Sequence, residues 1–366
     1  MAISLSGAAS SLGPPQHGGL DYRALKEAGV SPDEVLDFSV CTNPFGPSPA
    51  VLEAVAKADV ARYPDSAAWA LRERLATHHG LHPEQVLVTS GASQAIWLVA
   101  LSLAERGRHS LILGPTFAEY AYACQLAGGR VLFTIAPPAA GFRPDCDRAV
   151  QLVRRFSPQL VWLCNPNNPT GLYCGPQEVA ALLAACAEVG ALLVIDEAYV
   201  NFTPQGWDAV PLLESAHLVL IRSMTKDYAL AGLRLGYILA PSTIIEALAR
   251  VQPPWSIAST AQEAGIAALE SLDYYRRTWQ ELRALTQDLR EGLLALGYNA
   301  LPTDANFFLV EVGSASSIRE ELWQERILVR SCSSFGLPTY VRLGTRLPAQ
   351  NAKLLEALRA LAAKAR

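Results

Sequence analysis

Short apolar runs alternate with helix-forming stretches through the first two thirds of the chain. Runs of this kind, with few polar positions, are typical of strands buried on both faces of a parallel sheet. The alternation therefore predicts an α/β fold, with helices covering a mostly parallel sheet. Strands are predicted at Gln85–Thr89, Ser110–Leu113, Val131–Thr134, Leu160–Cys164, Leu192–Asp196 and Leu218–Ser223, and helices at Leu71–His79, Ser93–Glu105 and Gln177–Glu188.

The pattern changes after Pro253-Pro254, where charged and amphipathic stretches become longer. A smaller α+β domain is predicted there, with residues 1–42 as an N-terminal arm packing against it. The large domain is then residues 43–255 and the small one residues 256–366. Within the small domain we expect a long helix over about Thr260–Leu296, strands at Asn306–Val312, Ile327–Arg330 and Tyr340–Leu343, and a final helix from Ala349.

Composition narrows the possible partners. The 366 residues are 51% hydrophobic and 17% charged, with a net charge of −4. No long Lys/Arg block occurs, so neither nucleic acid nor a membrane surface is an expected partner. The seven cysteines are scattered without a C-x-x-C pair, which argues against a disulfide framework or a metal site and favours the cytoplasm. The apolar stretch Val179–Ile195 contains Glu188 and Gly190, so we interpret it as a buried helix, a turn and a strand.

Polar residues follow several predicted strands, at the sheet edge where ligands of α/β proteins bind. The turn Ser90-Gly91-Ala92-Ser93 opens a helix whose N–H groups could receive a phosphate, although for this motif taken alone an ordinary capped turn is the favoured explanation. Phe117 could stack on an aromatic cofactor ring or belong to the core. The loop Asn165–Gly171 is rich in turn formers, and Asn168 could donate a hydrogen bond to a ring oxygen from there.

Asp196 ends the apolar strand Leu192–Asp196. A carboxylate there costs several kcal/mol unless it is paired, and a protonated pyridine nitrogen is a suitable partner. The alternative is a cap on the following turn. Tyr199, three residues later, could reach a phenolic oxygen on the same ring.

The stretch Ser223–Gly236 carries the strongest chemical signal. Lys226 lies among small hydroxyl residues, and Arg234 follows eight positions later. A lysine held at one point, partly desolvated and near another cation can bond to a cofactor aldehyde, while arginine and hydroxyl groups hold a phosphate. Pyridoxal 5'-phosphate (PLP) has both groups. The alternative is a surface lysine and an ion-paired arginine.

Taken together, Asn165–Gly171, Asp196-Glu197-Ala198-Tyr199 and Ser223–Gly236 resemble fold-type I PLP enzymes of the aspartate aminotransferase superfamily. The resemblance covers nearly the whole chain. It implies that Lys226 bonds to PLP, that Asp196 pairs with the pyridine nitrogen, and that Phe117 stacks on the ring. It further implies a homodimer in which Tyr63 reaches the neighbouring subunit's cofactor. The implied ring-oxygen ligands are Asn168 and Tyr199, and the implied phosphate ligands are Ala92, Ser93, Ser223 and Arg234.

Two families within that superfamily fit. His17-Gly18-Gly19, Asp37-Phe38-Ser39 and the run from Arg330 to Leu337 resemble L-threonine-O-3-phosphate decarboxylases. Cys41 departs from that pattern, and Gly344-Thr345 resembles the histidinol-phosphate aminotransferases instead. Arg342 suits a substrate carboxylate, because its guanidinium can bind it through two parallel hydrogen bonds. By resemblance, the substrate phosphate would face His17, Arg330 and Arg346.

The first hypothesis is therefore decarboxylation of O-phospho-L-threonine to (R)-1-amino-2-propanol O-2-phosphate, a step of cobalamin biosynthesis. The alternative is a histidinol-phosphate aminotransferase, which needs 2-oxoglutarate as amino acceptor. A third hypothesis is a PLP-binding sensor module without catalytic activity.

Overall fold

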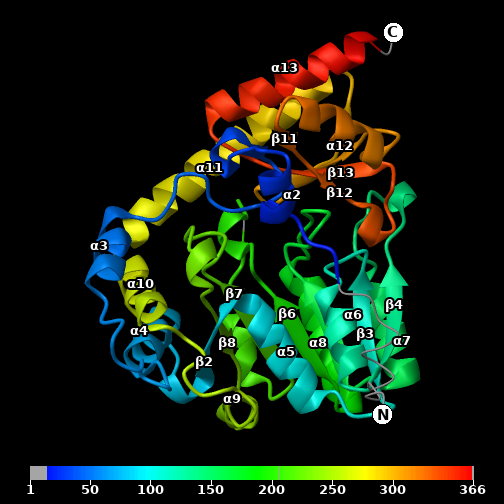
Figure 1. Cartoon of the computed structure of the whole chain (residues 1–366). Coiled ribbons are helices and arrows are strands. Elements are labelled where there is room, and N and C mark those ends of the chain that lie inside the picture. Colours follow the sequence, from blue (N-terminus) through cyan, green and yellow to red (C-terminus); the bar gives the residue numbers. More distant parts are fainter. Residues whose placement is uncertain (1–14, 205, 365–366) are drawn as a thin grey trace, which may run out of the picture.

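A computed structural model describes residues 15–204 and 206–364. A seven-stranded sheet covered by helices forms the lower part of Figure 1, and a smaller sheet with the C-terminal helices lies above it. The first fourteen residues of the predicted arm lie outside the described residues. None of the helices in the described ranges is long and apolar enough to cross a membrane.

The large sheet is mostly parallel, as predicted. Its strand order is β2-β8-β7-β6-β5-β3-β4, and β8 runs antiparallel to both of its neighbours. All six predicted strands are confirmed to within one residue at each end, whereas β8 was not predicted. The strands are β2 (Val86–Thr89), β3 (His109–Gly114), β4 (Arg130–Ile135), β5 (Leu160–Cys164), β6 (Leu192–Asp196), β7 (Leu218–Ser223) and β8 (Gly236–Leu239).

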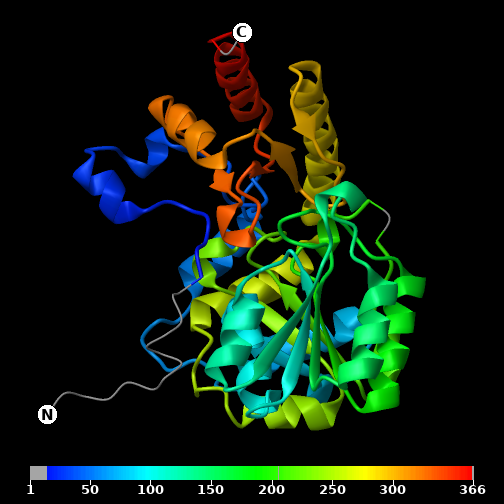
Figure 2. The same cartoon turned by 90° about the vertical axis from the view of Figure 1, so that its right-hand side faces the viewer.

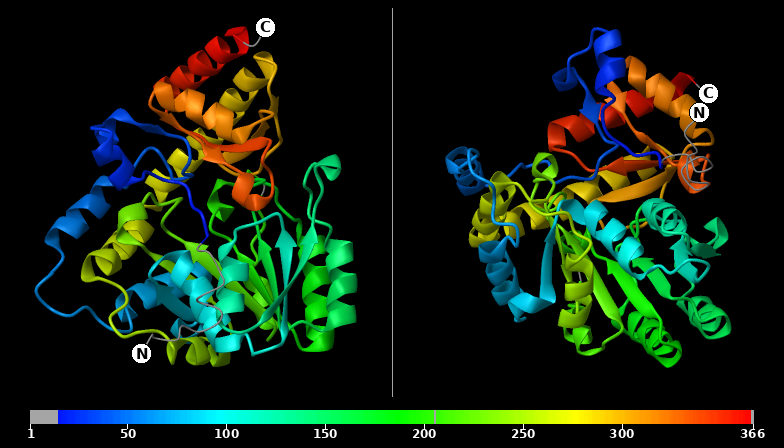
Figure 3. Two further views of the ribbon diagram at one scale, coloured as in Figure 1. Left: turned by 45° about the vertical axis from the view of Figure 1, so that its right-hand side comes forward. Right: turned by 60° about the horizontal axis from the view of Figure 1, so that its bottom comes forward.

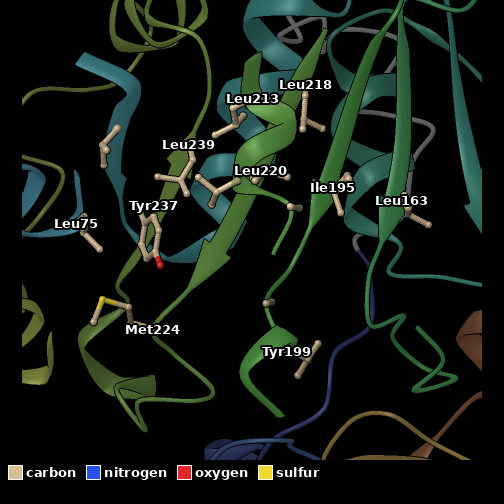
Figure 4. Close-up of a cluster of buried hydrophobic side chains, with 14 of the residues drawn as sticks. Leu75, Leu163, Ile195, Tyr199, Leu213, Leu218, Leu220, Met224, Tyr237 and Leu239 are labelled. Atoms are coloured by element: carbon tan, nitrogen blue, oxygen red, sulfur yellow. The ribbon is translucent and has the colours of Figure 1, made fainter. Parts of the chain in front are cut away.

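Both faces of the sheet are buried, because side chains along a strand point alternately to opposite faces. In β5, Trp162 belongs to one apolar cluster while Val161 and Leu163 belong to the other. Part of the second cluster, including Leu163 and Ile195, is drawn in Figure 4. Apolar residues at every position explain the continuous hydrophobic runs in the sequence.

Helices form a layer on each face of the sheet (Figures 2 and 3). The helices on the Trp162 side are α5 (Gly91–Leu103), α6 (Glu119–Leu126) and α9 (Ser242–Ala249). The other cluster includes residues of α4 (Trp69–His79), α7 (Cys146–Phe156), α8 (Pro176–Val189) and α10 (Ser259–Glu270), with α3 (Pro49–Lys57) packed on α10.

The smaller sheet is antiparallel, with strand order β12-β13-β10-β9. Its apolar side packs with helices from the last third of the chain around Phe308, Leu343 and Leu293. The elements are α11 (Leu272–Ala295), β9 (Asn299–Ala300), β10 (Phe307–Glu311), α12 (Ala315–Gln324), β12 (Arg330–Ser331), β13 (Tyr340–Gly344) and α13 (Pro348–Lys364).

The N-terminal segment packs against this smaller part of the molecule. After α2 (Tyr22–Glu27), strand β1 (Leu36–Asp37) pairs in parallel with β11 (Ile327–Leu328). The domain boundaries at residues 42 and 255 themselves remain a prediction.

Two predicted elements differ from the structure. The long helix over Thr260–Leu296 is two helices, because Ser271 ends α10 and its hydroxyl donates to the Ala267 carbonyl at 2.8 Å. The strand predicted at Ile327–Arg330 is divided between two sheets: β11 pairs with β1, and β12 pairs with β13. Local sequence could not reveal the division between two sheets, since it depends on distant partner strands.

Candidate active site

A cavity of about 300 Å³ lies at the carboxyl ends of the central parallel strands, below the smaller sheet. Most of the predicted site residues line it, although they come from separate parts of the chain. Those on its wall are His17, Ala92, Ser93, Phe117, Asn168, Asp196, Tyr199, Ser223, Lys226, Arg234, Arg330 and Arg342.

Two predicted site residues are elsewhere. Tyr63 is 81% exposed, and its ring packs against Trp255 with 4.8 Å between centroids. Arg346 is not among the residues that line this cavity, because β13 ends at Gly344 and the chain then turns toward α13, so its role toward the substrate stays a prediction. The buried Nε of Arg346 has no hydrogen-bond partner among the described residues.

One corner of the cavity is suited to a phosphate. Gly91 begins α5 at φ +73°, and a Cβ there would lie 2.8 Å from Nη2 of Arg234. The glycine therefore lets the guanidinium lie against the first turn of the helix, where N–H groups lack partners within the helix. Ser223, buried at the end of β7, adds a hydroxyl to this corner.

Asp196 lies at the end of β6 with both carboxyl oxygens engaged. The Tyr120 hydroxyl donates to Oδ2 at 2.7 Å, and the Ala198 N–H donates to Oδ1 at 3.0 Å. Burial raises the pKa of this carboxyl to about 6, and the two hydrogen bonds act in the opposite direction. Such a buried acid is stabilised in its charged form by a nearby cation.

Lys226 faces the same cavity from the turn after β7. Burial lowers the pKa of its amine, and the positive charges of Arg342 and Arg234 act in the same direction. Its carbonyl accepts a hydrogen bond of 2.8 Å from the Asn43 N–H, which anchors the backbone there. The amine is therefore neutral more often than an exposed lysine, as attack on an aldehyde requires.

Asn168 and Arg342 are bonded to each other. Nη1 of Arg342 donates to Oδ1 of Asn168, and Nη2 donates to the Ser39 carbonyl at 2.6 Å. The Asn168 amide nitrogen remains available as the donor predicted for a ring oxygen. The guanidinium lies 5.3 Å from the centroid of Phe307, and its buried Nε has no partner among the described residues.

Arg330 is the direct cross-strand neighbour of Arg342, on β12 and β13. The two residues are only 8% and 6% exposed, and neither forms an ion pair within the described residues. Burial lowers the pKa of Arg330, and the charge of Arg342 lowers it further. Two buried guanidinium groups without carboxylates make this wall a site for anions, because unpaired buried charge is costly.

The segment before α2 closes the cavity from one side. Nη2 of Arg330 donates to the Gln16 carbonyl and to the Ser334 hydroxyl, each at 2.7 Å. The ring of His17 lies 5.5 Å from that of Phe117, between centroids, and its Nε2 is 3.0 Å from Oε1 of Glu119. His17 thus reaches the cavity from a segment more than 300 residues from Arg330 in the chain.

Comparison with known proteins gives one family. The model for aminotransferase class I and II matches residues 33–358. The chain belongs to this family. It is 35% identical to a histidinol-phosphate aminotransferase of Symbiobacterium thermophilum (87% of this chain, 88% of that one) and 33% identical to a threonine-phosphate decarboxylase of Salmonella typhimurium (94% and 95%).

A solved structure supports the same assignment. The histidinol-phosphate aminotransferase of Sinorhizobium meliloti, in complex with pyridoxal-5'-phosphate, has a TM-score of 0.87 and 25% identity, covering 100% of this chain and 99% of that one. The fold of this aminotransferase-family protein is therefore that of fold-type I PLP enzymes.

Sequence reasoning missed several residues of the site. Tyr120, the partner of Asp196, lies one turn beyond Phe117 on α6, and no motif marks its hydroxyl. Glu119 was missed for the same reason. Cys164 and Thr225 also line the cavity. Cys164 is the last residue of a predicted strand, and Thr225 lies two residues after the end of another. These positions were a usable signal, because ligand sites in such sheets form at strand ends.

Proposed function

We propose that this aminotransferase-family enzyme decarboxylates O-phospho-L-threonine to (R)-1-amino-2-propanol O-2-phosphate. The observation that carries the proposal is the buried, adjacent pair Arg330 and Arg342, which has no carboxylate partner among the described residues. Directly opposed residues in an antiparallel pair have Cβ atoms about 5 Å apart. Both side chains start from neighbouring positions and line the same cavity, so a substrate that carries a carboxylate and a phosphate on neighbouring carbons suits this pair of cations.

The cofactor is PLP, and the cavity suits its functional groups. The corner formed by Ser223, Arg234 and the first turn of α5 would hold the phosphate, and the missing Cβ of Gly91 leaves room there for the Arg234 guanidinium. Asp196, whose buried carboxyl favours a cationic partner, would face the pyridine nitrogen. Lys226 would bond to the aldehyde.

When bound, PLP draws electrons from whichever bond at the substrate Cα stands perpendicular to its ring. The protein's task is to choose that bond. Arg342 would hold the carboxylate, while Arg330 and His17 would hold the phosphate, so that the substrate cannot rotate about Cα. Lys226 lies on the same cavity and is the group suited to move a proton at Cα.

Histidinol-phosphate aminotransferase is the second candidate, and the comparisons favour it. Among the most similar curated relatives that name is the more frequent one. Gly344-Thr345 resembles that family as well. Histidinol phosphate has no carboxylate, however, so Arg342 would serve only the second substrate, 2-oxoglutarate.

One pair of assays separates the two functions. Purified holoenzyme is incubated with O-phospho-L-threonine alone, and CO2 is measured; release without any keto acid supports the decarboxylase. In parallel, L-histidinol phosphate and 2-oxoglutarate are supplied, and glutamate is measured. Glutamate formation without CO2 release in the first assay would establish the aminotransferase instead.

We also propose a homodimer with shared sites. Tyr63 and Trp255 form an aromatic pair that is 81% and 50% exposed, and Val60, a little earlier in the chain than Tyr63, is 80% exposed. A second copy would bury this surface and bring Tyr63 to the neighbouring cofactor phosphate. Sedimentation velocity should give twice the chain mass, and Tyr63→Phe should weaken PLP binding without altering that mass.

A further inference from the structure

Glu119 is a buried carboxylate that no part of the proposed reaction uses. It begins α6, directly beside the cavity, and is only 8% exposed. Both of its oxygens have partners: Oε1 lies 3.0 Å from Nε2 of His17, and Oε2 accepts from Nε1 of Trp97 at 3.1 Å. The indole belongs to α5, whereas the imidazole belongs to the N-terminal segment.

The N-terminal segment has two kinds of anchor across the cavity. On the side of the smaller sheet, the Gln16 carbonyl accepts from Arg330, and the Gly19 N–H donates to the Ser39 hydroxyl at 2.8 Å. On the side of the large sheet, a hydrogen bond joins the segment to the helix layer. Among the described residues, this bond is the one between the side chains of His17 and Glu119. Without it, the imidazole would keep its ring contact with Phe117, but no hydrogen bond to a side chain on that side would fix the direction of its nitrogens among the described residues.

We propose that Glu119 is a positioning residue: by holding Nε2 of His17 it fixes the imidazole, and with it the N-terminal segment, at the substrate's phosphate. This rests on the proposed function in one respect, that the group facing His17 is a phosphate. Nδ1 of His17 has no hydrogen-bond partner among the described residues, so it is the ring nitrogen left for the ligand. Orientation of one ring nitrogen by a carboxylate is a common way to aim the other.

The decisive variant is Glu119→Gln. Glutamine has the same shape but carries no negative charge. The hydrogen bond between His17 and a charged carboxylate is therefore lost, even where the neutral amide group makes a weaker contact with the ring. Losing a hydrogen bond to a charged group corresponds to a change of about tenfold in affinity. Trp97→Phe is the matched control, because it removes the other partner of Glu119 and leaves His17 in place.

Binding is measured by calorimetry on holoenzyme with (R)-1-amino-2-propanol O-2-phosphate and, separately, with phosphate-free 1-amino-2-propanol. Glu119→Gln should raise Kd for the phosphorylated compound about tenfold and leave the phosphate-free compound unchanged. His17→Ala should do the same, and the double variant should be no weaker than either single one, because the two residues act as a unit. In turnover, KM should rise while kcat stays within about twofold.

Three results would overturn the inference: equal weakening for both compounds, additive effects in the double variant, or a Trp97→Phe effect as large as that of Glu119→Gln. These outcomes are distinct from failure of the proposed function, which wild-type protein reports by releasing no CO2. Should the aminotransferase assignment hold, L-histidinol phosphate and L-histidinol replace the two ligands, and the same comparison applies.

Discussion

Asn168 and Arg342 are 174 residues apart in sequence, yet the arginine donates a hydrogen bond to the asparagine side chain inside the cavity. The contact joins the loop after β5 to the strand β13 of the smaller sheet. A residue proposed to hold the cofactor ring therefore also orients one proposed to hold the substrate. The two binding functions are coupled through one side-chain contact.

Arg342→Lys should weaken substrate binding far more than cofactor binding. A lysine keeps the charge but lacks the planar guanidinium. The guanidinium can donate to Asn168, to the Ser39 carbonyl and to a substrate carboxylate at the same time. We expect KM to rise roughly 100-fold, with PLP affinity within about threefold of wild type. Asn168→Ala should weaken both, and substrate and cofactor titrations of the two variants would reveal whether this separation holds.

Lys226→Ala should remove the covalent attachment of PLP. Borohydride reduction of wild-type holoenzyme should add the mass of the reduced cofactor to the chain, and the variant should show no such increase by intact-mass spectrometry. Lys353→Ala, at a lysine on α13, is the control and should retain the increase. Retention of the mass shift in Lys226→Ala would identify another lysine as the attachment point.

Gly91→Ala should impair cofactor binding through a clash with Arg234. Its Cβ would lie 2.8 Å from Nη2, so the guanidinium must leave the phosphate corner. We expect PLP affinity to fall at least tenfold, together with about 1 kcal/mol of stability lost to the positive φ. Gly80→Ala is the matched control, since Gly80 has φ +67° and nothing within 4 Å of an added Cβ; it should lose stability alone.

Asp196 should make the stability of the cofactor-free protein depend on pH. Burial raises its pKa to about 6, above the usual 3.8, so the folded protein holds this proton more tightly than the unfolded chain. The resulting contribution to stability is complete below about pH 4 and is lost as pH rises through 6; its size is on the order of 3 kcal/mol.

Asp196→Asn removes this titration. Between pH 5 and pH 8, the cofactor-free variant should therefore lose less stability than wild type in urea unfolding. Asp147→Asn, at an exposed position on α7, should follow the wild-type curve. Parallel curves for wild type and Asp196→Asn would show that the acid does not titrate in this range.

Hydrophobic pattern alone was sufficient for six of the seven strands of the large sheet. Strands such as Leu160–Cys164 are buried on both faces, so every position must be apolar, and a continuous run is visible without knowledge of neighbours. Strand β8 was missed because Gly236–Leu239 is short and follows the turn that carries Arg234. The break at Ser271 was missed because the residues on both sides are good helix formers.

In the candidate active site, too, some residues could be predicted from the sequence and others could not. Lys226, Asp196 and Asn168 could be predicted because each lies at or just after the end of a strand, at the ligand-binding edge of the sheet. Arg346 could not be placed, since its position depends on how β13 turns into α13. Tyr120 and Glu119 lie on the first turn of a helix, where sequence does not indicate which way a side chain points.

The positions of six strands along the chain, the residue types at their ends and the lysine in its small polar setting were therefore determined by sequence alone, because they depend on local periodicity and chemistry. Tertiary structure decided which of these groups share a cavity: the pairing of Arg330 with Arg342, the contact of Asp196 with Tyr120, and the link from His17 to Glu119. Each joins segments distant in the chain, and only the packing of the two sheets brings such segments together.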